Sequence, residues 1–408
     1  MGKFTKALIA HGHDVDVITT GNNGGWRIDN SYIWNIFNNN SNIIYLKSPL
    51  STTKQKIKNF IIKINNMNPG ASFWGLSALA LAKKKHEINP YDFIVSRDVA
   101  DKSLFVGWSL YKKYGVPWIA ALNDPYPSSL YPPPYNNKKS KYMEFWREKI
   151  MRKTLSDATF VMFPSKRLLL YIEKKFGIKY KNNIILPHIG YSAKQRSLSI
   201  FEKKKLVILH AGRIHAGRSM DIFIRCFKKA IESYTSLILD VELRFLGKVK
   251  EYERKEIAKS EFADIVKFQS TVSYENSLEE MQNADALLLI EAVLQEGIFL
   301  PSKFCDYAIS GKPLLLFSPK NGTIADIVGR EHPGLLGQKE DDVVKGLKAF
   351  FNTVILRKGL DRYLCPDPKQ FSEERTIDKF LEYITKYNHS PYHIACNNYM
   401  AINEAKFN

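Results

Sequence analysis

Two arginines beside two glycines are the first residues in this chain whose chemistry points to a ligand. The apolar run "LVILHA" leads into the stretch "HAGRIHAGR", which shares its last two residues. This stretch contains Gly212 and Arg213, followed by Gly217 and Arg218. Paired guanidinium groups bind phosphate oxygens in a fixed geometry, and glycine lets the backbone approach a ligand closely. At the head of a helix, whose first N–H groups lack partners, this pattern suits a diphosphate, although two surface arginines would give the same motif.

A second group of such residues lies in "EGIFLPSKFCDYAISGKPLLLF", residues 296–317. Glu296 follows the strand-like run "DALLLIEAV" by a few residues, and "GIFLPSK" brings several backbone N–H groups to the start of a predicted helix. Asp306 falls about one turn into that helix, where a carboxylate can accept hydrogen bonds from a sugar diol. A capped helix with a solvated Asp is the alternative, but the neighbouring arginines favour a ligand site.

The elements that must position these residues are strands and helices in alternation. "YDFIVSR", "VPWIAALNDP" and "TFVMFPS" read as strands, separated by helical patterns such as "DKSLFVGWSLYKKYG". This alternation predicts an α/β protein with parallel, doubly wound sheets. Ligands bind such sheets beyond the carboxyl ends of the strands, which is where both groups of residues fall.

The alternation restarts after the polar stretch "YSAKQRSLSIFEKKK", and 408 residues exceed what one core usually holds. We therefore expect an N-terminal Rossmann-like domain over residues 1–195, a C-terminal domain over 196–388 and a tail over 389–408.

Positive charge is concentrated in the first half. Residues 1–190 contain 28 Lys and Arg against 12 Asp and Glu, so they carry +16 of the formal net charge of +19. A solvated lysine-rich face explains any single cluster, but the asymmetry predicts that the first domain faces an anionic partner. A membrane surface, a phosphate-bearing lipid and nucleic acid all meet that requirement.

Composition narrows the class of protein further. Hydrophobic residues make up 45% and charged residues 25%, the balance of a globular protein, and no apolar run approaches the ~20 residues of a membrane span. The four cysteines lie far apart without metal-ligand spacing, and the first residues lack the pattern of a secretory signal. We expect a cytoplasmic protein with reduced thiols and no bound metal.

Three stretches of the second half, in this order and spacing, resemble the donor half of family 4 glycosyltransferases: "HAGRIHAGRSMDIFIRCFKKA", "VELRFLGKV" and "DALLLIEAVLQEGIFLPSKFCDYAISGKPLLLF". "ALIAHGHDVDVITT", "YDFIVSR" and "YGVPWIAALNDPY" are similar to the acceptor half. The resemblance covers residues 1 to about 385. It implies the GT-B fold, in which two Rossmann-like, doubly wound domains face each other across a cleft.

The resemblance also implies roles for individual residues. Arg213 would contact the donor diphosphate, Arg218 stands where the family has a lysine, and Glu296 would lie close to the transferred sugar; these three are the expected catalytic residues. Asp306 would hold the nucleotide ribose. The other expected donor-binding residues are Gly212, His215, Thr271, Val272, Gly297, Ile298, Phe299, Leu300, Ser302 and Lys303, and the expected acceptor-side residues are Arg97 and Asp124.

The chain departs from the family pattern in three ways. The acidic pair is Glu-x9-Asp instead of Glu-x7-Glu, and Arg218 replaces a lysine while keeping the charge. The chain begins at what looks like the first helix, without the family's first strand and Gly-rich loop. Because that strand is central in such a sheet, we expect an apolar groove in its place.

The resulting hypothesis is a retaining, metal-independent glycosyltransferase that needs no cofactor. Its donor would be a nucleoside-diphosphate sugar, whose leaving diphosphate fixed cations and helix N-termini stabilise. Its acceptor would be a saccharide or a polyprenyl-phosphate-linked saccharide at an anionic membrane surface, on the inner face of the cell membrane, in surface polysaccharide or lipopolysaccharide biosynthesis. No side chain is assigned as general base.

Other functions remain open at this stage. The chain could be an inactive, truncated homologue that acts as an assembly partner, or a sugar-nucleotide epimerase or phosphorylase of the same fold. Nucleic-acid binding ranks last, because no aromatic residues interleave with the basic ones in a recognisable motif. The transferase hypothesis requires Arg213, Glu296 and Lys303 to converge on one cleft between the halves.

Overall fold

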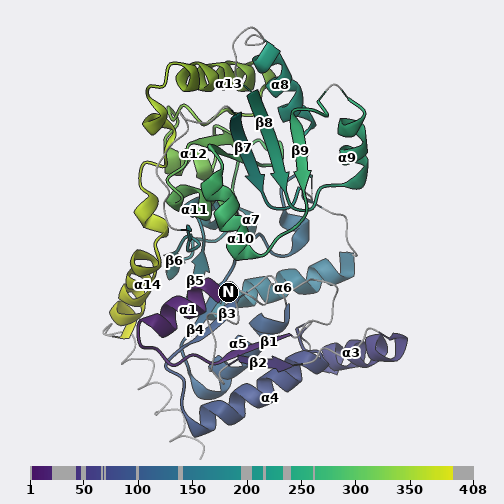
Figure 1. Ribbon diagram of the computed structural model, residues 1–408. Helices are drawn as coiled ribbons and strands as arrows, with labels where there is room; N and C mark the ends of the chain where they lie inside the picture. Colours follow the sequence, from purple (N-terminus) through teal and green to yellow (C-terminus); the bar gives the residue numbers. More distant parts are fainter. Residues whose placement is uncertain are drawn as a thin grey trace, which may run out of the picture.

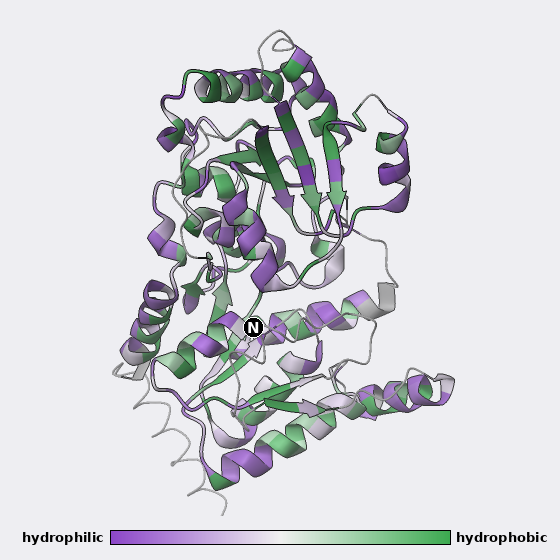
Figure 2. Cartoon of the chain, in the orientation of Figure 1, coloured by the Kyte–Doolittle hydropathy of each residue, from purple (hydrophilic) through white to green (hydrophobic). Residues whose placement is uncertain are grey.

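Parallel β-sheets from the two halves of the chain organise the molecule, one above the other (Figure 1). The computed structural model describes residues 2–20, 43–46, 52–65, 68, 70–97, 101–136, 141–193, 205–214, 217–232, 240–260 and 262–388. Within these ranges the helices in Figure 2 alternate between hydrophilic and hydrophobic residues, as expected for helices that pack one face on a sheet.

The second half contains one five-stranded sheet of order β11-β10-β7-β8-β9, with every neighbouring pair parallel. Its strands are β7 (Lys205–Ala211), β8 (Asp240–Leu246), β9 (Val266–Gln269), β10 (Ala286–Ile290) and β11 (Leu314–Phe317). Side chains alternate across a strand, so the unbroken apolar run of β10 supplies both faces: Leu288 and Ile290 join one core, Leu287 and Leu289 the other.

Helices cover both faces of this sheet. α8 (Asp221–Ile231), α9 (Glu251–Ala258) and α13 (Glu340–Ile355) pack on the first core, and α10 (Tyr274–Asn283), α11 (Ser302–Ile309) and α12 (Thr323–Val328) pack on the second. The predicted doubly wound arrangement is therefore confirmed in this half.

The first half contains a four-stranded parallel sheet of order β3-β4-β5-β6. Its strands are β3 (Ile94–Arg97), β4 (Trp118–Ala121), β5 (Phe160–Phe163) and β6 (Asn183–Ile185). Helices α5 (Asp101–Tyr114), α6 (Lys141–Asp157) and α7 (Lys166–Phe176) cover one face, and α1 (Gly2–Ala10) covers the other. A single 3-10 turn, η1 (Ser128–Leu130), follows β4.

A separate pair of parallel strands, β1 (Val17–Thr20) and β2 (Ile43–Leu46), lies beside this sheet together with α3 (Thr53–Asn65) and α4 (Phe73–Ile88). Among the described strands β1 pairs only with β2, and β3 pairs only with β4. A cavity of about 310 Å³ lies between β1 and β3, lined by apolar residues of both strands and of α1, α4 and α5. The cavity lies beside β3, at the edge of the described sheet; that a further strand belongs there stays a prediction.

The last helix, α14 (Glu373–Asn388), follows two 3-10 turns, η4 (Leu360–Tyr363) and η5 (Pro368–Phe371), and returns to the first half of the chain (Figure 1). Phe380 is fully buried and meets Phe4 and Phe93 edge to face, at ring-centroid distances of 5.0 and 5.7 Å. The sequence places this segment at the end of the second domain, but its apolar side covers the core beneath α1. The expected tail, 389–408, lies outside the described residues.

None of the helices in these ranges combines the length and the low polarity needed to cross a lipid bilayer.

Replacing Phe380 with Ala should destabilise the first half of the molecule by about 3–5 kcal/mol, because it removes a buried ring from a packed site. Urea unfolding followed by tryptophan fluorescence measures this loss. Glu382→Ala on the exposed side of the same helix is the matched control, with an expected change within about 0.5 kcal/mol. Equal stabilities of the two variants would show that α14 does not dock on the first half.

Candidate ligand-binding site

A cavity of about 930 Å³ lies between the two halves of the molecule. On the first half it is bounded by residues at the carboxyl ends of strands: Arg97 ends β3, Asp124 follows β4, and His188 follows β6. On the second half it is bounded by Arg218 and by the start of α11, where Ser302 is the first helical residue. The strands and helix starts of both halves thus direct their polar ends into one space.

Asp306 lies in this cavity and is almost fully buried. Its Oδ1 atom accepts three hydrogen bonds: from the Lys3 ammonium at 2.5 Å, from the Tyr191 backbone N–H at 2.9 Å and from the Tyr274 hydroxyl at 2.9 Å. Burial raises the pKa of this carboxyl, and the charge of Lys3 opposes that shift. Because Lys3 belongs to α1, the Asp306 carboxylate joins the two halves across the cavity.

Next to the Lys3–Asp306 pair, whose lysine also bonds the Ile189 carbonyl at 3.1 Å, Arg97 and His188 form a second polar pair. A guanidinium nitrogen of Arg97 lies 3.3 Å from His188 Nδ1. Burial, and next the positive charge of Arg97, lower the pKa of His188 to about 3, so the imidazole is neutral at physiological pH. The positive charge at this edge of the cavity therefore comes from Arg97 and from the nearby Lys3, and His188 does not add to it.

Lys303 lies behind the cavity, at the carboxyl end of β7. Its ammonium is 3.0 Å from Nε2 of the fully buried His210, whose Nδ1 lies 3.0 Å from the Leu288 carbonyl oxygen. The imidazole therefore donates a hydrogen bond through Nδ1 to that carbonyl and accepts one from the Lys303 ammonium at Nε2. Burial, followed by repulsion from Arg218, lowers the pKa of Lys303 to about 7.

Gly212 makes room for this lysine. The residue has φ of +119°, and a Cβ atom placed on it would lie 2.8 Å from Nζ of Lys303. Any side chain at this position would meet both an unfavourable backbone conformation and the ammonium group. The glycine that the sequence assigned to close ligand approach thus also accommodates a buried side chain.

Arg218 and Tyr135 meet at the edge of the 930 Å³ cavity. Their side chains are hydrogen-bonded, while burial raises the pKa of the Tyr135 hydroxyl and Arg218 opposes that shift. Nε of Arg218 is buried and has no hydrogen-bond partner among the described residues. An unpaired buried N–H on a guanidinium is costly, so this group is ready to donate a hydrogen bond to a ligand oxygen.

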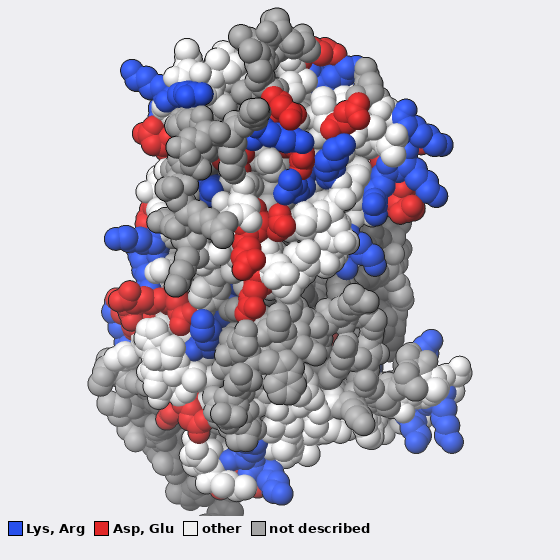
Figure 3. Space-filling view, viewed as in Figure 1, with Lys and Arg blue, Asp and Glu red and all other residues white. Residues whose placement is uncertain are grey.

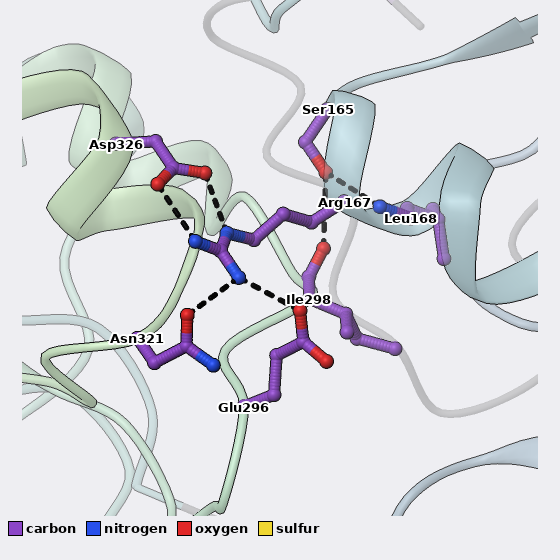
Figure 4. A network of polar contacts seen from close by, with 7 residues as sticks. All are labelled: Ser165, Arg167, Leu168, Glu296, Ile298, Asn321 and Asp326. Carbon is purple, nitrogen blue, oxygen red and sulfur yellow. Dashed lines mark hydrogen bonds and ion pairs between the residues drawn. The ribbon is translucent and has the colours of Figure 1, made fainter.

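Glu296 makes its contact with the first half of the chain (Figure 4). Nη1 of Arg167, near the start of α7, lies 2.7 Å from Glu296 Oε1 and 2.9 Å from Asn321 Oδ1. The same guanidinium also binds both carboxylate oxygens of Asp326. Beside it, the Ser165 hydroxyl donates to the Ile298 carbonyl at 3.0 Å while capping α7.

Glu296 and Ile298 line a different cavity, of about 660 Å³. Three segments lie between the two cavities, and we call them the partition: residues 131–135, 217–219 and 298–299. Tyr131, Tyr135, Arg218 and Phe299 of the partition line the larger cavity, whereas Pro132, Pro133, Pro134, Gly217, Ser219 and Ile298 line the smaller one. The ring of Tyr135 meets Phe299 edge to face at 5.3 Å, and Pro134 packs against Gly217.

The structure brings some of the predicted site residues together and separates others. The predicted residues that line the larger cavity are Arg97, Asp124, Arg218, Phe299, Leu300, Ser302 and Asp306. Arg213 and Thr271 have exposed side chains, and Val272 packs against the second core. His215 lies outside the described residues. Glu296 lines the smaller cavity, and the residues that line the two cavities include neither Arg213 nor Lys303, so the convergence of these three residues stays a prediction.

The backbone of Gly297 also differs from its expected role in binding phosphate. Its N–H donates to the Asn321 carbonyl at 3.0 Å, and its own carbonyl accepts from the Thr323 N–H at 2.7 Å. This amide is engaged within the second half of the chain.

Several residues at the site gave no usable signal in the sequence. Lys3 and Arg167 each contact carboxylates more than 100 positions away, and His210 sits inside an apolar strand. The position of His210 in an otherwise apolar run, just before Gly212, was the one sign in the sequence that a polar side chain is buried here. In the part of the chain that the structure describes, no group of three or more His, Cys, Asp or Glu side chains is arranged to hold a metal ion.

No protein-family model matches the chain, and no curated protein matches its sequence. The fold, in contrast, is similar to those of several solved structures. Sucrose-phosphate synthase from Thermosynechococcus elongatus aligns with a TM-score of 0.62 at 14% identity, over 98% of this chain and 92% of that one. A glycosyltransferase from Rickettsia africae ESF-5 aligns with a TM-score of 0.63 at 12% identity, over 95% and 94%.

A third similar structure is that of S. aureus MnaA with UDP, with a TM-score of 0.53 at 13% identity, over 96% of this chain and 94% of that one. At these identities the likeness concerns the fold. The chain has the GT-B fold, with two Rossmann-like domains that face each other across a cleft.

Substituting Gly212 with Ala should cost about 3 kcal/mol of stability, because the new methyl group adds backbone strain and displaces Lys303. Gly177→Ala is the matched control: Gly177 also has positive φ, but a Cβ there meets nothing within 4 Å, and its cost should be about 1 kcal/mol. Denaturant unfolding of both variants gives the comparison, and equal costs would show that Lys303 does not pack on Gly212.

Proposed function

We propose that this protein is a glycosyltransferase that moves a sugar from a nucleoside-diphosphate sugar to a saccharide or lipid-linked saccharide. The observation that supports this most directly is the interdomain cavity, in which Arg218, the start of α11 and Asp306 lie on one side and Arg97 and Asp124 on the other. The first set suits a donor with a diphosphate and a sugar diol. The second set leaves room for an acceptor from the opposite domain.

The donor would be bound by four groups of the second domain. The N–H groups of the first turn of α11 and the unpaired Nε of Arg218 would bind the diphosphate oxygens. The Lys303 ammonium, which lies behind the cavity, would add positive charge near the bound diphosphate. Asp306 Oδ2, the oxygen that Lys3 and the two tyrosines do not engage, would accept from the ribose hydroxyls.

Glu296 can reach the transferred sugar only if the partition shifts. Tyr135 fills the space between Arg218 and Phe299, and its ring separates the larger cavity from the one that contains Glu296. A donor diphosphate would compete with the Tyr135 hydroxyl for Arg218. Displacement of residues 131–135 would then join the two cavities and bring Glu296 and the diphosphate site into one cleft.

The chemistry follows from this placement. As the bond between sugar and diphosphate breaks, negative charge develops on the leaving phosphate, and cations already fixed by the protein stabilise it without reorganising. Retention of the anomeric configuration and independence from metal and cofactor remain part of the proposal. The proposal also includes an acceptor carried on polyprenyl phosphate, an anionic membrane surface at the cytoplasmic face, and a place in surface polysaccharide or lipopolysaccharide synthesis.

Nucleotide sugars of uridine are the first donors to test, because the similar S. aureus MnaA structure contains UDP. Isothermal calorimetry with a panel of nucleotide sugars should find one that binds. Arg218→Gln should weaken its affinity at least about tenfold through the loss of charge-assisted hydrogen bonds. Arg225→Gln, which removes the same charge from an exposed position on α8, should stay within about twofold of the wild type.

Absence of binding by every nucleotide sugar would overturn the proposal and favour an inactive assembly partner. Binding that Arg218→Gln leaves intact would place the donor elsewhere. Turnover of the donor without an added acceptor, to an isomeric nucleotide sugar, would identify an epimerase instead.

Donor affinity should also fall as the pH rises. The pKa of Lys303 is about 7, so its ammonium is lost above neutral pH, while the diphosphate of a nucleotide sugar keeps its charge. Above pH 7, affinity should decrease by up to about tenfold per pH unit, until the pKa of Lys303 in the complex is passed. His210 stays neutral throughout, because burial lowers its pKa.

Calorimetry between pH 6 and pH 9 on wild type and Lys303→Met measures this effect. Lys303→Met should bind the donor weakly, and its affinity should change less with pH than that of the wild type. This difference distinguishes titration of Lys303 from titration of the buried Glu291, whose pKa is raised by burial. Parallel profiles would exclude Lys303 as the titrating group.

A further inference from the structure

Helix α3, with the sequence "TKQKIKNFIIKIN", has an apolar strip that faces solvent. Ile57, Phe60 and Ile61 are 56%, 53% and 51% exposed. With about 100° between successive residues, these three side chains fall within one sector of the helix, Ile57 between the other two. Single exposed apolar residues are ordinary on protein surfaces, but three neighbours on one helix face are a feature that needs a partner.

Lysines border this strip on both sides. On the helical wheel Lys54 and Lys58 lie next to Ile61, and Lys56 lies next to Phe60 on the other edge. All three lysines are exposed, and the helix contains no acidic residue. The outer end of α3 extends away from the body of the molecule and carries lysine side chains beside uncharged ones (Figures 1 and 3).

The opposite face of α3 holds the helix to the first domain. The Asn59 side chain accepts the Phe73 backbone N–H at 3.0 Å, and Ile62 packs against the core beside α4 and α5. Lys63 is half-buried near Asp101, and burial lowers its pKa. The apolar strip is therefore presented outward by a helix whose inner side is already engaged.

We propose that α3 is the element that docks this protein on an anionic lipid bilayer, with Ile57, Phe60 and Ile61 in the acyl boundary and the flanking lysines on lipid phosphates. An apolar strip between two rows of cations is the pattern of a helix that lies in the plane of a membrane interface. The inference deepens the proposed function, on which its biological purpose rests, because it places the acceptor-side domain at the surface that would hold a lipid-linked acceptor.

An anionic bilayer accounts for both the apolar strip and the lysines beside it, whereas a second protein copy or a nucleic acid accounts for only one of these features. A second copy of the chain meeting this strip with two-fold symmetry would bring lysines opposite lysines, which is unfavourable without acidic partners on the helix. Nucleic acid would pair with the lysines but has no apolar layer for the strip. Anionic lipid supplies phosphates at the depth of the lysines and hydrocarbon beneath them.

Flotation with phosphatidylcholine vesicles, with and without phosphatidylglycerol, tests the proposal on the full-length protein. Wild type should float only with the anionic vesicles and less at high salt. The variant I57S/F60S/I61S should lose at least about tenfold in partitioning, and K54Q/K56Q/K58Q should lose its preference for phosphatidylglycerol. The control I88S/I178S/L356S, which removes three exposed apolar residues from other elements, should float like the wild type.

Nucleotide-sugar affinity and the unfolding midpoint of each variant, measured alongside, separate this inference from the proposed function. Loss of flotation in I57S/F60S/I61S with both values unchanged supports docking through α3. Flotation without nucleotide-sugar binding supports the docking surface and overturns the transferase. Wild-type flotation of I57S/F60S/I61S, or a dimer in sedimentation velocity that this variant dissociates, would overturn docking through α3.

Discussion

Lys3 and Arg167 of the first half of the molecule form ion pairs with carboxylates of the second half, and the geometry of the site depends on these contacts. Lys3 on α1 binds Asp306, and Arg167 on α7 binds Glu296, Asn321 and Asp326. They connect the carboxyl edges of two sheets that belong to separate cores, so they set the distance between the surfaces that bound the large cavity. Two of these carboxylates, Asp306 and Glu296, are those that the family resemblance assigns to the ribose and to the transferred sugar.

Asp306 and Glu296 thus form ion pairs between the two halves and are also expected to bind ligand, and this combination has a physical consequence. A buried carboxylate without a cationic partner would be costly, and Lys3 supplies that partner to Asp306. A ligand that brings hydroxyl groups to Asp306 Oδ2 adds to this arrangement, whereas a ligand that needs Glu296 must compete with Arg167. The second competition takes place at the surface, where both Glu296 and Asp326 are about half exposed and water weakens the ion pair. The site can therefore rearrange more easily around Glu296 than around Asp306.

Cations held at low exposure are the other feature of the second domain. Burial and the nearby charge of Arg218 lower the pKa of Lys303 to about 7, and His210 remains neutral between the sheet and Lys303 because burial lowers its pKa. Such an arrangement costs stability in the absence of an anion. It is the electrostatic reason to expect an anionic ligand here, independent of any resemblance.

Much of the fold followed from local pattern. The run "ALLLI" of β10 is apolar at every position because helices cover both sides of its sheet, and that periodicity needs no knowledge of partners. The same reasoning placed Arg218, Ser302 and Asp306 at the carboxyl edge, where the structure has them. It did not find α3, whose exposed isoleucines gave no core-facing periodicity, and it did not place α14 on the first domain.

By itself, the sequence determined the alternation of strands and helices, the parallel sheets, and the edge at which the polar residues gather, because each depends on periods of two and 3.6 residues along the chain. Only the tertiary structure decided that Lys3 reaches Asp306, that Arg167 holds Glu296, and that residues 131–135 divide one cleft into two cavities. These depend on how two separately folded cores meet. The contacts join residues more than 100 positions apart, and no local periodicity encodes which side chains will face one another there.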